Sequence, residues 1–291
     1  MTGLTLGLRD TVGRTAVGSD RATIYRWAGL VALVPTVVQL AFTIGTNTPL
    51  GLRLPLQAIG APIEAAAVAG PAVAALVLGY TATNDLVRVA MLTAGVFGGL
   101  TLVSRTATGP AIVSLGTAGV LLAVSQRPRT AETGALLRFG VTIAFVVGIV
   151  TSLSASLGFE PAITRRLGSV SIAVAIAGTP AYAGISLRSL AVGAIAGVLV
   201  FGFGLLSPVL TAAVSLLGLG IVGLPLVLFA LGAVGGMTAV ASGAERRAVP
   251  VVLAGLLVLA AGVPTTVPVA VAVLVAIVLF AASESGQGVT E

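Results

Sequence analysis

Glu64 is the only acidic side chain that lies within an apolar segment of this 291-residue chain. A carboxylate in apolar surroundings is costly, and it often marks a site that handles protons or cations. Pro62, two residues earlier, suits the first turn of a helix, where the helix dipole stabilises a carboxylate. Two interpretations of Glu64 follow: a coupling carboxylate, or a residue at a helix start that pairs with Arg53.

A stripe of polar residues precedes Glu64 in another apolar segment. Thr36, Gln39, Thr43 and Asn47 are spaced by three, four and four residues, which places them on one face of a helix. Hydrocarbon does not accept an amide cheaply, so this face is expected to point into a helical bundle. It would form either one wall of a solute path or a seam of hydrogen bonds between helices.

Several kinds of catalytic chemistry are absent from the sequence. There is no Cys and no His, and all 15 basic residues are Arg. These absences exclude thiol nucleophiles, histidine proton shuttles, the usual zinc ligands, Schiff-base lysines and P-loop nucleotide binding. There is also no Asp-rich motif and no loop long enough to hold a soluble catalytic domain. The chain is therefore expected not to be an enzyme and to need no cofactor or metal.

Two long runs without charge determine the fold class. No charged residue occurs in residues 189–244 or 248–283, and only 8% of the whole chain is charged, against about 25% in soluble domains. A membrane-spanning helix needs roughly 20 apolar residues, so each run has the length of two spans. The sequence predicts an all-α, polytopic integral membrane bundle.

Apolar runs and their breakers predict ten transmembrane helices. The helices make one transmembrane domain, 27–283, between an N-terminal segment 1–26 and a tail 284–291. The halves 27–157 and 168–283 would have five helices each and start on opposite sides of the membrane, which is the arrangement of inverted repeats. Pro208 and Pro225 could divide the region 190–241 into three pieces. The predicted helices are 27–46, 60–81, 86–104, 110–125, 138–157, 168–187, 190–212, 218–241, 249–263 and 267–283.

The distribution of Arg predicts the orientation. Cytoplasmic loops of membrane proteins are enriched in Lys and Arg. With both termini in the cytoplasm, eleven Arg fall on that side, and only Arg53, Arg105, Arg165 and Arg166 fall outside. The net charge of +6 therefore reflects membrane topology and not a nucleic-acid partner. We expect a multi-pass protein of the plasma membrane, and the Arg-only, Ala-rich and Gly-rich composition is typical of a prokaryotic genome of high GC content.

Three local features have structural interpretations. Asn84 is expected to cap a helix in which Asp85 and Arg88 form an ion pair. Pro180 is expected either to break or to kink its helix. Glycines four residues apart are expected to let helices approach closely, and these pairs are Gly95/Gly99, Gly193/Gly197 and Gly232/Gly236.

The leading functional hypothesis is a secondary transporter or channel-like permease for a small solute, working by alternating access. Thr36, Gln39, Thr43 and Asn47 would line the path, and Glu64 would be the coupling carboxylate. The alternative is a non-catalytic membrane subunit, either a permease or a scaffold, that works with a separate ATPase. In that case the lipid-embedded chain would meet its protein partners at the cytoplasmic loops 126–137 and 242–248.

Overall fold

The computed structural model describes residues 4–47, 57–128, 132–206 and 226–285, and these ranges are helical apart from short connections. The helices vary widely in length, from one turn to 44 residues. They are α1 Leu4–Asn47, α2 Gln57–Thr81, α3 Asp85–Val103, η1 Arg105–Ala107, α4 Thr108–Ser125, α5 Thr133–Ser156, α6 Pro161–Gly178, α7 Pro180–Ala183, α8 Leu187–Leu206, α10 Leu226–Glu245, α11 Val249–Ala261 and α12 Val267–Ser285.

The first two helices begin earlier than their apolar runs predict. α1 begins at Leu4 and not at residue 27, so residues 4–26 continue the same helix. α2 begins at Gln57 and not at residue 60. Hydropathy marks where a helix becomes apolar, whereas the helix itself continues through polar residues until the sequence offers a breaker.

The prediction of one helix over 168–187 is wrong. α6 begins at Pro161, because proline suits the first helical position, and it ends at Gly178. Pro180 then opens the single turn α7, and Gly184 follows it with a φ of 71° that glycine adopts without strain. Pro180 therefore breaks the predicted helix.

The next two helices extend beyond their predicted ranges at the ends that border described residues. α8 (Leu187–Leu206) begins at Leu187 where residue 190 was predicted, and α10 (Leu226–Glu245) ends at Glu245 where residue 241 was predicted. Pro208 and Pro225 both lie outside the described residues, so the possible division of this region into three pieces stays a prediction.

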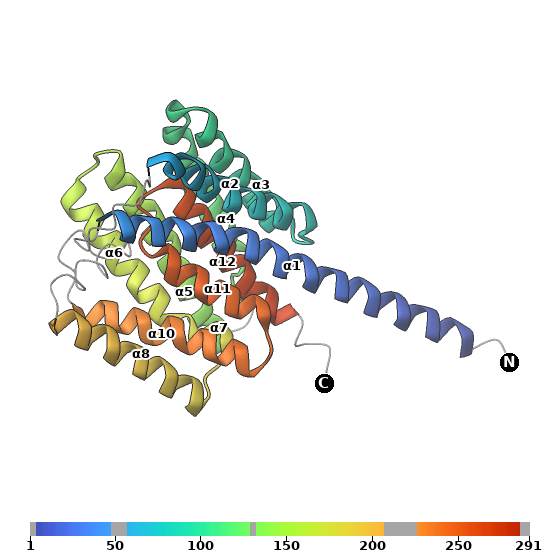
Figure 1. Cartoon of the computed structure of the whole chain (residues 1–291). Helices are drawn as coiled ribbons and strands as arrows, with labels where there is room; N and C mark the ends of the chain where they lie inside the picture. Colours follow the sequence, from blue (N-terminus) through green and yellow to red (C-terminus); the bar gives the residue numbers. More distant parts are fainter. Residues whose placement is uncertain (1–3, 48–56, 129–131, 207–225, 286–291) are drawn as a thin grey trace.

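α12 is the central helix of the bundle. α11 and α12 (red) lie between α2–α4 on one side and α8 and α10 on the other (Figure 1). α12 contacts α1, α2, α3, α4 and α5, so the last helix of the predicted second half packs against every helix of the first half. All its residues from Ala270 to Phe280 are buried.

The outer helices present apolar side chains at the surface of the bundle. Val198 on α8 is 70% exposed and Val113 on α4 is also 70% exposed. Large apolar side chains in such positions are suited to contact with lipid. Six described helical stretches are long and apolar enough to cross a membrane, and three shorter apolar helices accompany them. α6, which carries Arg165 and Arg166, is in neither group, so the number ten stays a prediction.

Most glycines of the three predicted pairs bring neighbouring helices into close contact, but a Cβ at Gly232 would meet nothing within 4 Å, so the prediction is wrong for that residue. A Cβ at Gly95 would lie 2.8 Å from the backbone oxygen of Ala72, so α3 touches the backbone of α2. A Cβ at Gly193 on α8 would likewise lie 2.5 Å from the backbone oxygen of Val234 on α10. The expected helix cap is confirmed too: Asn84 Oδ1 accepts from the backbone N–H of Leu86 at 2.9 Å.

The ion pair that was expected beside this cap is confirmed as well. Arg88 donates to Asp85 at 3.2 Å. Both partners are exposed, so the pair contributes little to stability.

Candidate functional site

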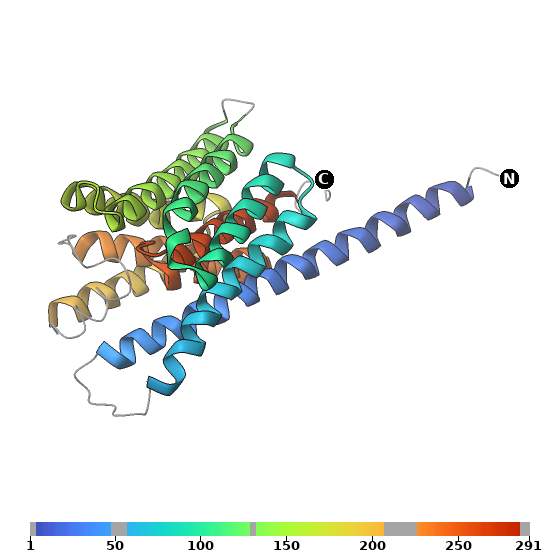
Figure 2. The ribbon, with the colours of Figure 1, turned by 90° about the horizontal axis from the view of Figure 1, so that it is seen from above.

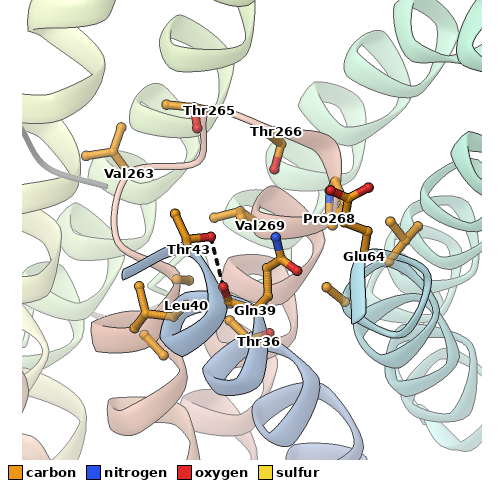
Figure 3. A pocket seen from close by; sticks show the side chains of 14 residues that line it. Thr36, Gln39, Leu40, Thr43, Glu64, Val263, Thr265, Thr266, Pro268 and Val269 are labelled. Atoms are coloured by element: carbon orange, nitrogen blue, oxygen red, sulfur yellow. Dashed lines mark hydrogen bonds between the residues drawn. The ribbon is translucent and has the colours of Figure 1, made fainter. Parts of the chain in front are cut away.

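A cavity of about 490 Å³ lies where α1 ends, α2 begins and the connection from α11 to α12 crosses between them. We call it the polar cavity. Figure 3 shows Gln39 of α1 and Glu64 of α2 beneath the segment that carries Thr265 and Thr266. Its polar lining residues are Thr36, Gln39, Thr43, Glu64, Thr265 and Thr266, and apolar side chains such as Leu40, Val68 and Val269 complete the wall.

The structure brings together residues that the sequence singled out on separate helices. Thr36, Gln39 and Thr43 share the face of α1 that their spacing predicted, and Glu64 of α2 lines the same cavity. Asn47 is the last residue of α1, and its side chain lies outside the described part of the chain. The sequence did not indicate a role for Thr265 and Thr266, because two threonines beside Pro264 are typical of an ordinary turn.

The placement of Glu64 corrects one of its two interpretations. α2 begins at Gln57, so Pro62 lies inside the helix and Glu64 is seven residues from its start, roughly 10 Å along the axis. A carboxylate there is beyond the first turn, where the helix dipole would stabilise it. Arg53, the partner proposed from the sequence, lies outside the described residues. Glu64 is exposed to the cavity, and no ion-pair partner is found for it among the residues that are described.

Two hydrogen bonds of the polar stripe lie within α1. Thr36 donates its hydroxyl proton to the carbonyl of Ala32 at 2.8 Å, and Thr43 donates to the carbonyl of Gln39 at 2.9 Å. The side-chain oxygen of Gln39 is buried, and it has no hydrogen-bond partner in the described structure. Such an unpaired buried amide oxygen costs about 1–3 kcal/mol, and in the described residues this oxygen forms no hydrogen bond to another helix.

The connection between α11 and α12 lies deep in the bundle. α11 has only 13 residues, about 20 Å, which is shorter than the roughly 30 Å hydrocarbon core of a bilayer. Gly262 ends it with a φ of 59°, and Val263 is 2% exposed. Non-helical backbone at membrane depth is tolerated where it is buried in protein or lines a watery cavity, and this segment does both.

A second cavity, of about 310 Å³, lies at the opposite end of α12. The end of α12 lines it with Val278, Ala281 and Ala282. Its polar lining residues come from the middle of α1, from the connection between α2 and α3, and from α4 and α5 near the connection between them. These are Tyr25, Thr83, Asn84, Ser125, Gln126 and Arg138. Sequence reasoning gave none of them a role in a solute path.

An apolar segment of α12 separates the two cavities. Val269 lines the polar cavity and Val278 lines the second cavity, which puts them about 13 Å apart along the helix. Every residue between them, Ala270 to Ile277, is at most 1% exposed. We call residues 270–277 the α12 plug.

A buried hydrogen-bond network closes the inner end of the second cavity. Gln126 Oε1 accepts from Thr142 at 2.7 Å. The single hydroxyl proton of Tyr182 is shared between Gln126 Oε1 at 3.1 Å and the carbonyl of Arg138 at 2.9 Å. Thr142 and Tyr182 are themselves hydrogen-bonded. The Tyr182 ring stacks on Phe280 of α12 with centroids 5.3 Å apart, so the network ties α4, α5 and α7 to the central helix.

One of the two loops predicted to meet partners is partly engaged within the chain. Ser242 donates to the carbonyl of Ala183 at 2.9 Å, and Glu245 accepts from Ser186 at 2.6 Å. These contacts fasten the segment after α7 to the end of α10. Arg246 and Arg247 remain exposed at the same place.

The polar cavity offers several side chains that can bind a ligand. It holds one carboxylate, one amide and several hydroxyls, and none of its lining residues is a His or Cys that would pair with a hydroxyl for nucleophilic attack. Among the described residues, no three His, Cys, Asp or Glu side chains gather to hold a metal ion.

Comparison with known proteins gives the family of the chain. Residues 25–281 match the model of an integral membrane family of unknown function, DUF8068. No curated protein and no solved structure matches the chain. The match spans every helix that lines either cavity, and it agrees with the all-helical fold and the apolar outer surface. The chain is a multi-pass membrane protein, and it belongs to this integral membrane family.

Proposed function

We propose that this protein is a secondary carrier that moves a small solute across the plasma membrane of a prokaryotic cell by alternating access. In the predicted orientation, the polar cavity faces the outside and the second cavity faces the cytoplasm. Thr36, Gln39 and Thr43 line the solute path, and Glu64 is the coupling carboxylate.

The observation that carries this proposal is the arrangement of the two cavities around the α12 plug. A carrier needs a site that is reachable from one side while the other side is sealed. The polar cavity supplies such a site, and about 13 Å of buried apolar helix supplies the seal. An open channel would instead need a continuous polar path along α12.

Gln39 provides the sharpest test of the carrier. The purified protein is reconstituted into liposomes, and uptake of labelled neutral, cationic and anionic solutes is measured. Gln39→Leu is expected to abolish uptake of the transported solute without lowering expression, because the amide is the buried polar group that faces the cavity. Val38→Leu is the matched control, since Val38 is the neighbouring residue, is 44% exposed and does not line the cavity. Normal uptake by Gln39→Leu, or no uptake of any solute class by the wild type, would argue against the carrier.

A membrane subunit of a larger complex is the second candidate function, and one observation favours it. The N-terminal part of α1 extends well beyond the body of the bundle in both views (Figures 1 and 2). Such an arm, with the exposed Arg246 and Arg247, offers a place for a cytoplasmic partner. Co-purification in mild detergent followed by mass spectrometry distinguishes the candidates, because a stoichiometric ATPase would identify a subunit and a protein without partners would favour the carrier.

A further inference from the structure

The charge of the polar cavity points to the kind of solute it takes. Glu64 is the only charged residue in its described lining, and no Arg contributes to it there. Arg53, the nearest basic residue in the sequence, belongs to the connection outside the described residues. The described wall therefore carries one negative charge and no positive charge to balance it.

The uncharged polar groups of the wall include hydrogen-bond acceptors. The hydroxyl proton of Thr36 is donated to the carbonyl of Ala32, so this oxygen can only accept a further hydrogen bond. The hydroxyls of Thr265 and Thr266 can accept as well as donate. The wall can therefore accept hydrogen bonds from a cation beside Glu64.

The ends of two helices at the cavity act in opposite directions, and Pro268 weakens the end that would favour an anion. α11 ends there, with Ala260 and Ala261 in the wall, and the last carbonyls of a helix carry the negative end of its dipole. α12 begins there, but Pro268 in its first turn has no N–H, so this helix start has one donor fewer for an anion.

The size and apolar lining favour an organic ligand over a bare ion. A volume of about 490 Å³ lies within the usual range for small-molecule pockets, and a single inorganic ion would leave most of it to water. Leu40, Val68 and Val269 give the wall an apolar part against which a hydrocarbon portion can pack.

We propose that the polar cavity binds a small organic cation, whose ammonium group is held by the Glu64 carboxylate. This inference rests on the proposed carrier function, because it names the class of solute that the same cavity takes. The apolar part of the cation packs against Leu40, Val68 and Val269.

Ligand binding to the full-length protein in detergent tests the proposal. Ethylammonium, tetramethylammonium and sodium, all as chlorides at equal ionic strength in phosphate buffer, are titrated by calorimetry. Ethylammonium is expected to bind the wild type, and Glu64→Gln is expected to weaken it at least about tenfold, since a hydrogen bond to a charged group contributes about 1.5–3 kcal/mol. Glu160→Gln, which removes an exposed acid between α5 and α6, is the matched control and is expected to leave the affinity unchanged. Arg53→Gln is expected not to weaken binding.

The outcomes separate this inference from the carrier proposal. Binding of sodium alone, equal affinity of Glu64→Gln, or no binding of any cation would overturn the organic-cation assignment. In those cases uptake of another solute that depends on Gln39 would leave the carrier intact. Glu64-dependent binding of ethylammonium without uptake of any cation into liposomes would instead support the cavity assignment and refute the carrier.

Discussion

The contact between α5 and α6 allows a prediction whose size follows from the structure. These helices approach closely because Gly148 on α5 faces Ile172 on α6. A Cβ at Gly148 would lie 2.5 Å from Ile172 Cγ1 and 2.6 Å from its Cδ1. Carbon atoms in contact prefer about 3.5–4.0 Å, so Gly148→Ala requires the Ile172 side chain to leave its position or the helices to move apart.

The energetic cost can be isolated with a second glycine on the same helix. Gly140 is exposed, and a Cβ there would meet nothing within 4 Å. Both substitutions gain the same helix propensity, about 1 kcal/mol, which cancels when the two variants are compared. The remaining difference is the steric cost at Gly148, which we expect to be about 1–3 kcal/mol.

Thermal unfolding in mild detergent, followed by far-UV circular dichroism, measures this difference. Gly140→Ala is expected to unfold at or slightly above the wild-type temperature. Gly148→Ala is expected to unfold below Gly140→Ala by several degrees, at roughly 2–4 °C per kcal/mol for a chain of this size. Equal unfolding temperatures for the two alanine variants would refute the close approach of α5 and α6.

Two further predictions concern the second cavity and the α12 plug. Tyr182→Phe keeps the ring stacked on Phe280 but removes the hydrogen bonds of its hydroxyl, so the variant is expected to be about 1–2 kcal/mol less stable in detergent. Tyr80→Phe, at an 84% exposed position, is its control, and equal stability of the two variants would show that the network contributes nothing. Because the chain has no Cys, single-cysteine variants can be labelled with a membrane-impermeant maleimide. Thr266→Cys should react in intact cells, and Thr83→Cys should react only after the cells are permeabilised. Val273→Cys, in the α12 plug, should react under neither condition. Rapid labelling of Val273→Cys would contradict the seal.

The polar cavity was only partly predictable from the sequence. The spacing of Thr36, Gln39 and Thr43 was enough to place them on one face of α1, because that relation is local to one helix. The position of Glu64 in its helix could not be predicted, because Pro62 suggested that the helix begins there, whereas α2 begins at Gln57. That α2 carries Glu64 to the wall formed by α1 is a tertiary contact with no local signal.

The network at the second cavity was invisible to sequence reasoning for a similar reason. Gln126 and Tyr182 are 56 residues apart, and each lies at a helix end where a polar or aromatic residue is ordinary. The break at Pro180 was one of two expected outcomes, but the sequence did not indicate that the short turn α7 brings Tyr182 onto Phe280.

The sequence by itself determined that this chain is an all-helical membrane protein, because long runs without charge leave no other environment for it. It could not determine which helix lies at the centre. α8 and α12 are similarly apolar, yet Val198 of α8 is 70% exposed and Val273 of α12 is fully buried. Lipid tails are as apolar as a protein interior, so hydropathy does not distinguish a helix that faces lipid from one that faces protein. Only helix packing decides this, and that packing makes α12 the barrier between the two cavities.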